Sequence, residues 1–444
     1  MISDFAARLA AAGLSPAEAA RKQQLFAAAA EALQARGGAT ARPPAAWFIP
    51  GRVELLGKHT DYAGGRSLLC TVERGFCFMA RARVDDRIAI SDLRSGQSTR
   101  FDLSRSLIAP PRSLSRDWTV YPRTVARRLV QDFGITRGVE LAFASDLPYA
   151  SGLSSSSAFS IGVFFALGAA NRLPEHSLYR AHLVAPQALA EYLGCLENGR
   201  PFGPFEATEG VGTLGGCEDQ AAILMASPGE VIQFRFLPVC LERRVPFPER
   251  YALVIGSSGV VAEKTGAAME SYNRAARATI AIHQRWLGTG ARDPNLGAAL
   301  ARSREVVPEL RKLLAGEPAL LARLEQFAAE TEELIPAAGA ALSVGGLDAF
   351  GRLVDRSQAG AESGLGNQIP ETIHLQRAAR RLGAVAASAF GAGFGGSVWT
   401  MVEMERAEAF RLAWDANYLK AFPERKHRAE FFLSRPGPAA LRLA

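Results

Sequence analysis

The stretch that decides the fold is Asp146-Leu147-Pro148-Tyr149-Ala150-Ser151-Gly152-Leu153-Ser154-Ser155-Ser156-Ser157-Ala158. An apolar run with strand character, 139–144, precedes it, and an apolar run with helical character, 159–167, follows it. A Gly- and Ser-rich loop between a strand and a helix presents backbone N–H groups and the positive end of the helix dipole. The stretch therefore favours a phosphate-binding loop whose serine hydroxyls could also bind Mg²⁺. Taken alone, it fits a plain helix-capping turn equally well.

Two further motifs lie far from this loop. Residues 50–65 are Pro-Gly-Arg-Val-Glu-Leu-Leu-Gly-Lys-His-Thr-Asp-Tyr-Ala-Gly-Gly, and residues 391–397 are Gly-Ala-Gly-Phe-Gly-Gly-Ser. The first is not a P-loop, because its glycines are too far apart and His59 stands where Ser or Thr is required. The second satisfies G-x-G-x-x-G, but a strand-like run, 398–402, follows it instead of a helix. A glycine-rich turn between two strands that approaches a nucleotide fits better.

In this order and at this spacing, the three motifs together resemble the signatures of the GHMP small-molecule kinases, and the first resembles the galactokinase family in particular. The resemblance runs from about residue 45 to about residue 405. It implies an α+β fold with two lobes. The N-terminal lobe, expected over 1–240, would be similar to domain 2 of ribosomal protein S5, and the C-terminal lobe, expected over 241–444, would be ferredoxin-like. It also implies ATP and Mg²⁺ as cofactors, and transfer of the γ-phosphoryl group to a sugar hydroxyl, in this family the anomeric one.

The composition is that of an ordinary globular enzyme. A chain of 444 residues with 48% hydrophobic and 21% charged residues can bury a large core over more than one domain, which excludes general disorder. The net charge of +7 is scattered without a long basic run, so it indicates surface solvation and attraction of anions such as ATP, not nucleic-acid binding. The five cysteines lack C-x-x-C spacing, which indicates reduced thiols and a cytoplasmic protein. Neither a signal peptide nor a membrane-spanning run is expected, and the chain is expected to act as a monomer or weak homodimer.

The periodicity of apolar residues predicts the order of elements. A helix is predicted over 15–36, and strands are predicted at 46–49, 67–72, 75–84 and 87–91. Further helices are predicted over 117–133 and 184–198, and further strands at 231–236 and 251–256. The region from 262 to about 382 is expected to be mostly helical.

The resemblance implies a catalytic pair. In the family, an aspartate followed by Gln, shortly after a glycine-containing loop, accepts or orients the proton of the sugar hydroxyl, and Asp219 in the segment 215–220 matches it. Glu218 is the rival carboxylate, and the following Gln220 selects Asp219. The two acids could also merely cap a helix. Arg52 matches the arginine beside the catalytic aspartate, where its charge would keep the carboxylate ionised and offset charge on the attacking oxygen.

The resemblance also implies a metal site. The metal-binding serine falls late in the serine run and points to Ser156, and the glutamate that precedes an Asn points to Glu197. One carboxylate, one hydroxyl, phosphates and water suit Mg²⁺. The following segment, 199–213, is longer than the usual connection in the family, so that Glu206 and Glu209 stay open as alternatives.

Substrate and nucleotide contacts follow from the same motifs. His59 and Asp61 are similar to residues that contact the sugar hydroxyls, Gly216 lies in the adjoining loop, and Tyr272 resembles a tyrosine of the other lobe that closes over the sugar. The tyrosine could instead be a half-buried helical residue. The expected nucleotide-binding residues belong to the serine loop and the glycine loop, with one aromatic residue: Ser151, Gly152, Leu153, Ser154, Ser155, Ser156, Gly393, Gly395 and Trp118. Core packing explains Trp118 almost as well.

Lys58 is the clearest departure from the family, which carries Glu at this position to accept a bond from the terminal hydroxymethyl group of the sugar. A lysine supplies only donors. If Lys58 contacts the substrate, a uronic acid or a sugar phosphate would gain more from it than galactose does. Alternatively, Lys58 turns away and pairs with Glu54. A sensor that binds ATP and sugar without turnover is a further alternative on the same fold, against which the intact serine run, Asp219 and Arg52 argue.

Overall fold

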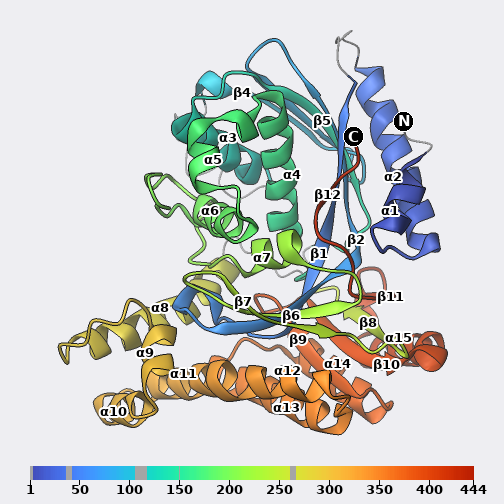
Figure 1. Cartoon of the computed structure of the whole chain (residues 1–444). Coiled ribbons are helices and arrows are strands. Elements are labelled where there is room, and N and C mark those ends of the chain that lie inside the picture. The colour runs from blue at the N-terminus through green and yellow to red at the C-terminus, as the bar shows by residue number, and fades with distance from the viewer. Residues whose placement is uncertain (1–3, 37–42, 106–117, 150, 261–266) are drawn as a thin grey trace.

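The computed structural model describes residues 4–36, 43–105, 118–149, 151–260 and 267–444. Residue 117 and residues 262–266, with which two of the expected helices begin, lie outside the described residues, as does Ala150 of the serine loop. Within the described part the chain has the expected α+β content, arranged in two lobes (Figure 1).

An eight-stranded sheet forms the centre of the first lobe. Its main path runs in the order β12-β1-β2-β5-β3-β4, and β6 and β7 continue from β2. The two strands expected at 67–72 and 75–84 are one 17-residue strand, β2, which pairs with β1 along most of its length. The bounds are β1 Ala45–Leu56, β2 Arg66–Ala82, β3 Arg87–Asp92, β4 Ser98–Asp102, β5 Val139–Ser145, β6 Glu230–Arg235, β7 Cys240–Pro246 and β12 Leu441–Arg442.

Helices cover both faces of this sheet. In Figure 1 the N-terminal pair, α1 (Phe5–Ala11) and α2 (Pro16–Ala35), lies on one face, and the group that includes α4 (Ser155–Ala170) lies on the other. α4 is apolar nearly all round and is therefore buried between the sheet and its neighbouring helices. The remaining helices of this lobe are α3 Val120–Phe133, α5 Ser177–His182, α6 Pro186–Asn198 and α7 Glu218–Met225.

A four-stranded sheet in the order β11-β8-β10-β9 forms the second lobe. Along the chain, β8 is followed by helices, the β9–β10 hairpin, α15 and β11, which is the ferredoxin-like arrangement. The glycine-rich turn joins β9 to β10, as the sequence predicts. The bounds are β8 Tyr251–Ser257, β9 Ala386–Phe390, β10 Ser397–Glu403, β11 Glu430–Ser434, α8 Ala267–Leu287, α9 Leu296–Arg302, α10 Val306–Leu313, α11 Pro318–Ala328, α12 Ile335–Ser343, α13 Leu347–Gly360, α14 Pro370–Arg381 and α15 Ala407–Ala421, with π-helical segments η6 Ala329–Leu334 and η7 Ala361–Leu365.

The lobes do not divide at residue 240. β7 pairs with β6 in the first sheet, so the division expected between 240 and 241 would cut a hairpin. β12, at the C-terminus, also pairs with β1 of the first sheet. Strand pairing instead favours a boundary between β7 and β8, with the last strand returned to the first lobe.

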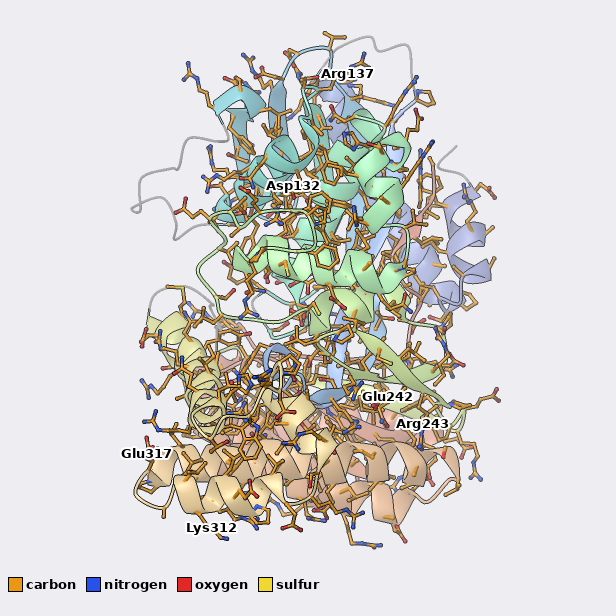
Figure 2. All side chains as sticks on the ribbon, turned by 60° about the vertical axis from the view of Figure 1, so that its left-hand side comes forward. Asp132, Arg137, Glu242, Arg243, Lys312 and Glu317 are labelled. Atoms are coloured by element: carbon orange, nitrogen blue, oxygen red, sulfur yellow. The ribbon has the colours of Figure 1, made fainter. Side chains whose placement is uncertain are left out.

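The surface agrees with the dispersed charge of the sequence. Figure 2 shows labelled charged side chains at opposite ends of the molecule, with Arg137 at the top, and Lys312 of α10 and Glu317, which precedes α11, at the bottom. Glu242 of β7 pairs with Arg66 of β2 at 2.9 Å.

All five cysteines are free thiols. None of the described helices combines the length and the apolar character that crossing a bilayer requires.

Candidate active site

The three sequence motifs meet at one pocket between the lobes. The backbone N–H of Gly391 donates to Glu54 Oε2 (3.3 Å), His59 Nε2 donates to the Ala392 carbonyl (2.9 Å), and Ser397 Oγ donates to the Ser151 carbonyl (2.7 Å). The glycine loop therefore contacts both the arginine motif and the serine loop. A Cβ atom on Gly391 would lie 2.9 Å from the carbonyl oxygen of Gly152, so only glycine permits this approach. The empty space in and around the pocket, with the solvent at its mouth, is about 480 Å³.

Arg52 and Asp219, the expected catalytic pair, are in direct contact in this pocket. β1 positions Arg52, and the first turn of α7 positions Asp219. Arg52 Nε donates to Asp219 Oδ1 at 2.8 Å, and its Nη1 donates to the Gly152 carbonyl at 2.6 Å. Burial opposes the charge of the guanidinium, but the carboxylates of Asp219, Glu218 and Glu54 outweigh burial and raise the pKa of Arg52. The arginine is therefore a permanent cation that ties the serine loop to the aspartate.

Glu218, the rival of Asp219, has a different environment. Its Oε2 accepts a hydrogen bond from Ser67 Oγ at 2.6 Å, and its Oε1 lies 3.6 Å from Arg52 Nε. Burial and then the nearby Glu54 carboxylate raise the pKa of Glu218 well above its usual range, although Arg52 opposes this. These surroundings disfavour the charged form of Glu218, whereas Asp219 contacts the Arg52 guanidinium directly.

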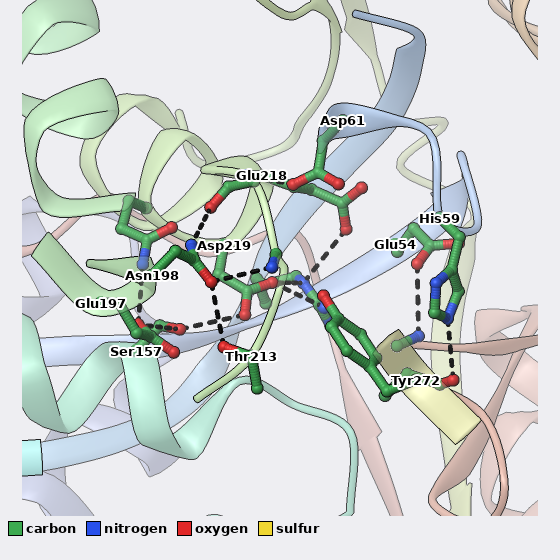
Figure 3. A pocket seen from close by; sticks show the side chains of 16 residues that line it. Glu54, His59, Asp61, Ser157, Glu197, Asn198, Thr213, Glu218, Asp219 and Tyr272 are labelled. Atoms are coloured by element: carbon green, nitrogen blue, oxygen red, sulfur yellow. Dashed lines mark hydrogen bonds and ion pairs between the residues drawn. The ribbon is translucent and has the colours of Figure 1, made fainter. Parts of the chain in front are cut away.

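Ser157 is the serine whose hydroxyl reaches the acidic groups. Its Oγ lies 3.0 Å from Glu197 Oε2 and 3.1 Å from Asp219 Oδ2 (Figure 3). Ser156, the expected metal ligand, is half-buried and does not line the pocket. Successive helical residues point about 100° apart, so that only one serine of the run can point at Glu197, and four consecutive serines do not reveal which one.

Glu197 lies at the end of α6 and lines the pocket, as expected. Gln220 Nε2 donates to its Oε2 at 2.9 Å and fixes the carboxylate. The alternatives in the long connection lie elsewhere: Glu206 is exposed, and Glu209, with 55% of its side chain exposed, pairs with Arg127 at 2.8 Å. The hydroxyl and carboxylate oxygens of Ser157 and Glu197 are the hard ligands that suit Mg²⁺.

The expected sugar-contacting residues also line the pocket. His59 Nε2 faces a carbonyl, which only accepts, so Nε2 carries the proton and Nδ1 accepts from the Tyr62 hydroxyl at 3.0 Å. The Tyr272 ring lies against His59, with centroids 4.9 Å apart. Asp61 accepts the backbone N–H of Glu218 at 3.0 Å. Any Cβ on Gly216 would lie 2.3 Å from Asp61 Oδ2, which explains a glycine there.

Lys58 turns away from the pocket. Its side chain is 1% exposed, and its Nζ donates to Ser388 Oγ of β9 (2.8 Å) and Ser357 Oγ of α13 (3.4 Å). Glu330 of η6 accepts hydrogen bonds from Ser357 Oγ and from the backbone N–H of Gly57, both at 2.8 Å. The structure therefore does not support Lys58 as a substrate contact, because two serines of the second lobe hold its ammonium group inside the protein.

The serine loop has groups available for a nucleotide phosphate. Ser154 adopts φ +60° at the start of α4, and its buried Oγ has no hydrogen-bond partner within the described ranges. A buried orphaned donor at a helix N-terminus fits an anionic ligand such as the phosphates of ATP. The Leu153 carbonyl accepts the backbone N–H of Arg52, while Ser155 lies in the first turn of α4.

The other expected nucleotide contacts are not among the residues that line the pocket. Gly393 and Gly395 belong to the β9–β10 turn, where the backbone N–H of Phe394 donates to the Asn367 carbonyl at 2.7 Å. Trp118 packs edge-on against Phe159, and its Nε1 donates to Gln97 Oε1 at 2.7 Å. The contact with Phe159 belongs to the core, whereas the bond to Gln97 is exposed.

Among the residues that line the pocket, sequence reasoning assigned no site role to Ser157, Thr213 or Glu54. Thr213 lies in the long connection, and its Oγ1 donates to Asn198 Oδ1 at 3.0 Å. A signal for Glu54 was present, because side chains two apart on a strand share a face. A carboxylate two residues after Arg52 therefore belongs beside it.

Comparisons with known proteins identify the family of the chain. The galactokinase galactose-binding signature matches residues 34–82, the GHMP kinases N terminal domain matches 120–196, and the GHMP kinases C terminal domain matches 333–420. The galactokinase of Roseiflexus sp. (strain RS-1) is 30% identical over 370 residues, which cover 82% of this chain and 84% of the relative. The galactokinase of Thermococcus kodakarensis is 26% identical and covers 89% of this chain and 99% of the relative.

The fold comparison agrees as well. The crystal structure of Lactococcus lactis galactokinase complexed with galactose matches with a TM-score of 0.76 at 24% identity, covering 94% of this chain and 100% of that chain. The expected two-lobed GHMP fold is thereby confirmed. The chain belongs to the galactokinase family of the GHMP kinases and is a sugar kinase.

Proposed function

We propose that the sugar is galactose and that its anomeric hydroxyl receives the γ-phosphoryl group of ATP. The observation that carries the proposal is the buried Arg52–Asp219 pair, which shares one pocket with Ser157 and Glu197. The match to the galactose-binding signature over 34–82 supports galactose as the sugar.

The residues of the pocket divide the work of phosphoryl transfer. Asp219 accepts the proton of the attacking hydroxyl, and Arg52 holds Asp219 ionised and offsets the negative charge that develops on the oxygen. Ser154 and the first N–H groups of α4 hold the phosphates. Ser157 and Glu197 would hold Mg²⁺, whose charge neutralises the transferring phosphoryl group when it is bound. Most of the rate acceleration then comes from positioning and charge neutralisation.

The charge of the pocket supports a neutral sugar over an acidic one. Lys58, the residue that could have attracted a uronate or a sugar phosphate, is held away by Ser388 and Ser357. The carboxyl groups that line the pocket outnumber the single arginine, Arg52. An additional anion would be repelled there, whereas sugar hydroxyls supply the donors that carboxylates accept. The lining carboxyl groups are Glu54, Asp61, Glu197, Glu218 and Asp219.

A substrate screen tests the proposal. ADP release is measured with ATP, Mg²⁺ and a panel of galactose, other neutral hexoses, galacturonate and galactose 6-phosphate, and the position of the phosphate is then determined. We expect turnover on galactose with the phosphate on the anomeric oxygen. Preference for an acidic sugar would contradict the substrate, and binding of sugar and ATP without turnover would identify a sensor.

We also infer a cytoplasmic protein, which the five free thiols support. It is expected to act as a monomer or weak homodimer, which light scattering at several concentrations checks.

A further inference from the structure

Glu54 is a buried carboxylate that lines the pocket with one oxygen unsatisfied. It follows Arg52 by two residues on β1, so both side chains lie on the same face of the strand. The side chain is buried, at 2% exposure, and its Oε2 accepts the backbone N–H of Gly391. Its Oε1 is buried as well, and no donor in the described part of the chain reaches it. A buried acceptor without a donor is costly, and such an atom at a ligand pocket indicates that the ligand supplies the donor.

The position of Glu54 separates it from the groups that act on the phosphoryl group. In Figure 3, Ser157 and Glu197 lie at one end of the pocket, and Glu54 and His59 lie at the other. A ligand group that reaches Glu54 is therefore remote from the reacting hydroxyl beside Asp219. Such a contact discriminates between sugars and takes no part in the proton transfer.

The surroundings of Glu54 act on its charge in opposite directions. Burial raises the pKa of Glu54 to about 7, while the positive charges of Lys58 and Arg52 lower it and the Glu330 carboxylate raises it. Lys58 acts from outside the pocket, because Ser388 and Ser357 hold its ammonium group. The lysine thus compensates the charge of Glu54 without donating a hydrogen bond to its Oε1.

We propose that Glu54 is a sugar-binding residue that determines specificity, because its Oε1 accepts a hydrogen bond from one sugar hydroxyl remote from the phosphoryl-transfer site. This inference rests on the proposed function as a galactose kinase. It adds that the pocket selects a neutral hydroxyl at this position and rejects a carboxylate or phosphate there, since an anion offers no donor and meets a carboxylate.

Removing single sugar hydroxyls tests the inference. Binding of galactose and its 2-, 3-, 4- and 6-deoxy analogues is measured by calorimetry without ATP, and kcat/KM is measured with ATP. One deoxy analogue should bind the wild-type protein about ten- to a hundredfold more weakly, because the lost bond is to a charged group. In Glu54→Gln, this penalty should shrink to about threefold or less, since the neutral amide oxygen is a weaker acceptor. The penalties at the other positions should persist.

Glu330→Gln is the matched control. It removes the same charge from the same buried cluster, but Glu330 does not line the pocket. It should leave the profile of deoxy penalties unchanged. An unchanged profile in Glu54→Gln, or an equal change in Glu330→Gln, would overturn the inference, because Glu54 would then act only through the fold.

Two further measurements keep the inference testable. If Glu54→Gln fails to fold, Glu54→Asp keeps the charge but withdraws the oxygen, and it should weaken the same single penalty. If the wild-type protein does not phosphorylate galactose, the proposed function fails by itself, and the deoxy series is repeated on the sugar that the substrate screen identifies. Failure of every sugar to bind would overturn both the proposed function and the role of Glu54.

Discussion

Glu218 and Asp219 are adjacent in sequence and chemically alike, yet they occupy different environments. Asp219 contacts the Arg52 guanidinium directly at 2.8 Å, whereas Glu218 contacts the Ser67 hydroxyl and lies near Glu54. Opposite charge favours the ionised form of a carboxyl group, while burial beside a like charge favours the protonated form. The first environment therefore favours the ionised carboxylate that a general base requires.

Asp219→Asn should therefore abolish phosphoryl transfer and change ATP affinity by no more than a few fold. A positioned general base contributes about 10²–10⁴ to the rate, so kcat should fall by at least about a hundredfold. Glu218→Gln is the control, and it should be mild because burial and the Glu54 carboxylate already disfavour the charged form of Glu218. Steady-state ADP release gives kcat, and nucleotide titration gives the affinity for ATP. A loss in kcat below about tenfold for Asp219→Asn would contradict the assignment.

The pKa of Glu54, raised by burial to about 7, makes sugar binding depend on pH. If the ionised carboxylate accepts the sugar hydroxyl, binding lowers the pKa of Glu54, and affinity rises as the pH increases through about 7. Below that value affinity should fall by at most about tenfold per pH unit. The charged and titratable groups around Glu54 are Arg52, Lys58, Glu330, Glu218 and, at the same end of the pocket, His59. Calorimetry between pH 6 and 8 should show the dependence in the wild type and a flat profile in Glu54→Gln. The same slope in both proteins would assign it to another group.

The start of α4 and the end of α6 together form the candidate metal site. The sequence predicted both helices and placed Glu197 correctly in the pocket, because motif order and helical periodicity are local properties. It could not choose among four serines, because the choice depends on the rotation of α4 relative to α6, which tertiary packing sets.

The fusion of two predicted strands into β2 has a similar cause. Glu73, which interrupts the apolar pattern of that strand, is buried by accepting the backbone N–H of Ser15 at 2.6 Å.

Ser157→Ala and Glu197→Gln should each raise the Mg²⁺ concentration required for half-maximal activity. Even outer-shell partners of bound metals cost about 10–100-fold when they are replaced, so we expect a shift of at least about tenfold. Ser156→Ala and Glu209→Gln are controls with the same chemical change outside the pocket, and each should stay within about twofold. Mg²⁺ titrations at saturating sugar and ATP measure the shifts. A larger shift for either control would show that the metal site was wrongly assigned.

Across the whole molecule, Lys58 connects the two lobes. It follows β1 of the first sheet, and its ammonium group binds Ser357 and Ser388 of the second lobe, roughly 300 residues later in the chain. No local pattern could reveal this contact. The sequence suggested a substrate contact instead, because the family carries at this position a Glu that binds the sugar. The compensating carboxylates, Glu54 and Glu330, are equally remote from each other in sequence. The lysine is therefore expected to stabilise the junction of the lobes.

Lys58→Glu should destabilise the protein without exchanging its substrate. The substitution places a third carboxylate beside Glu54 and Glu330 and removes the cation, and breaking a buried charge pair costs about 3–5 kcal/mol. Chemical denaturation should show this loss, while Lys312→Glu, at an exposed position on α10, should change the free energy of unfolding by less than about 0.5 kcal/mol. The ratio of kcat/KM for galactose to that for galacturonate should stay constant, because Lys58 does not line the pocket. If the substitution instead raises activity on galactose and lowers activity on the acidic sugar at unchanged stability, the ammonium group of Lys58 reaches the substrate.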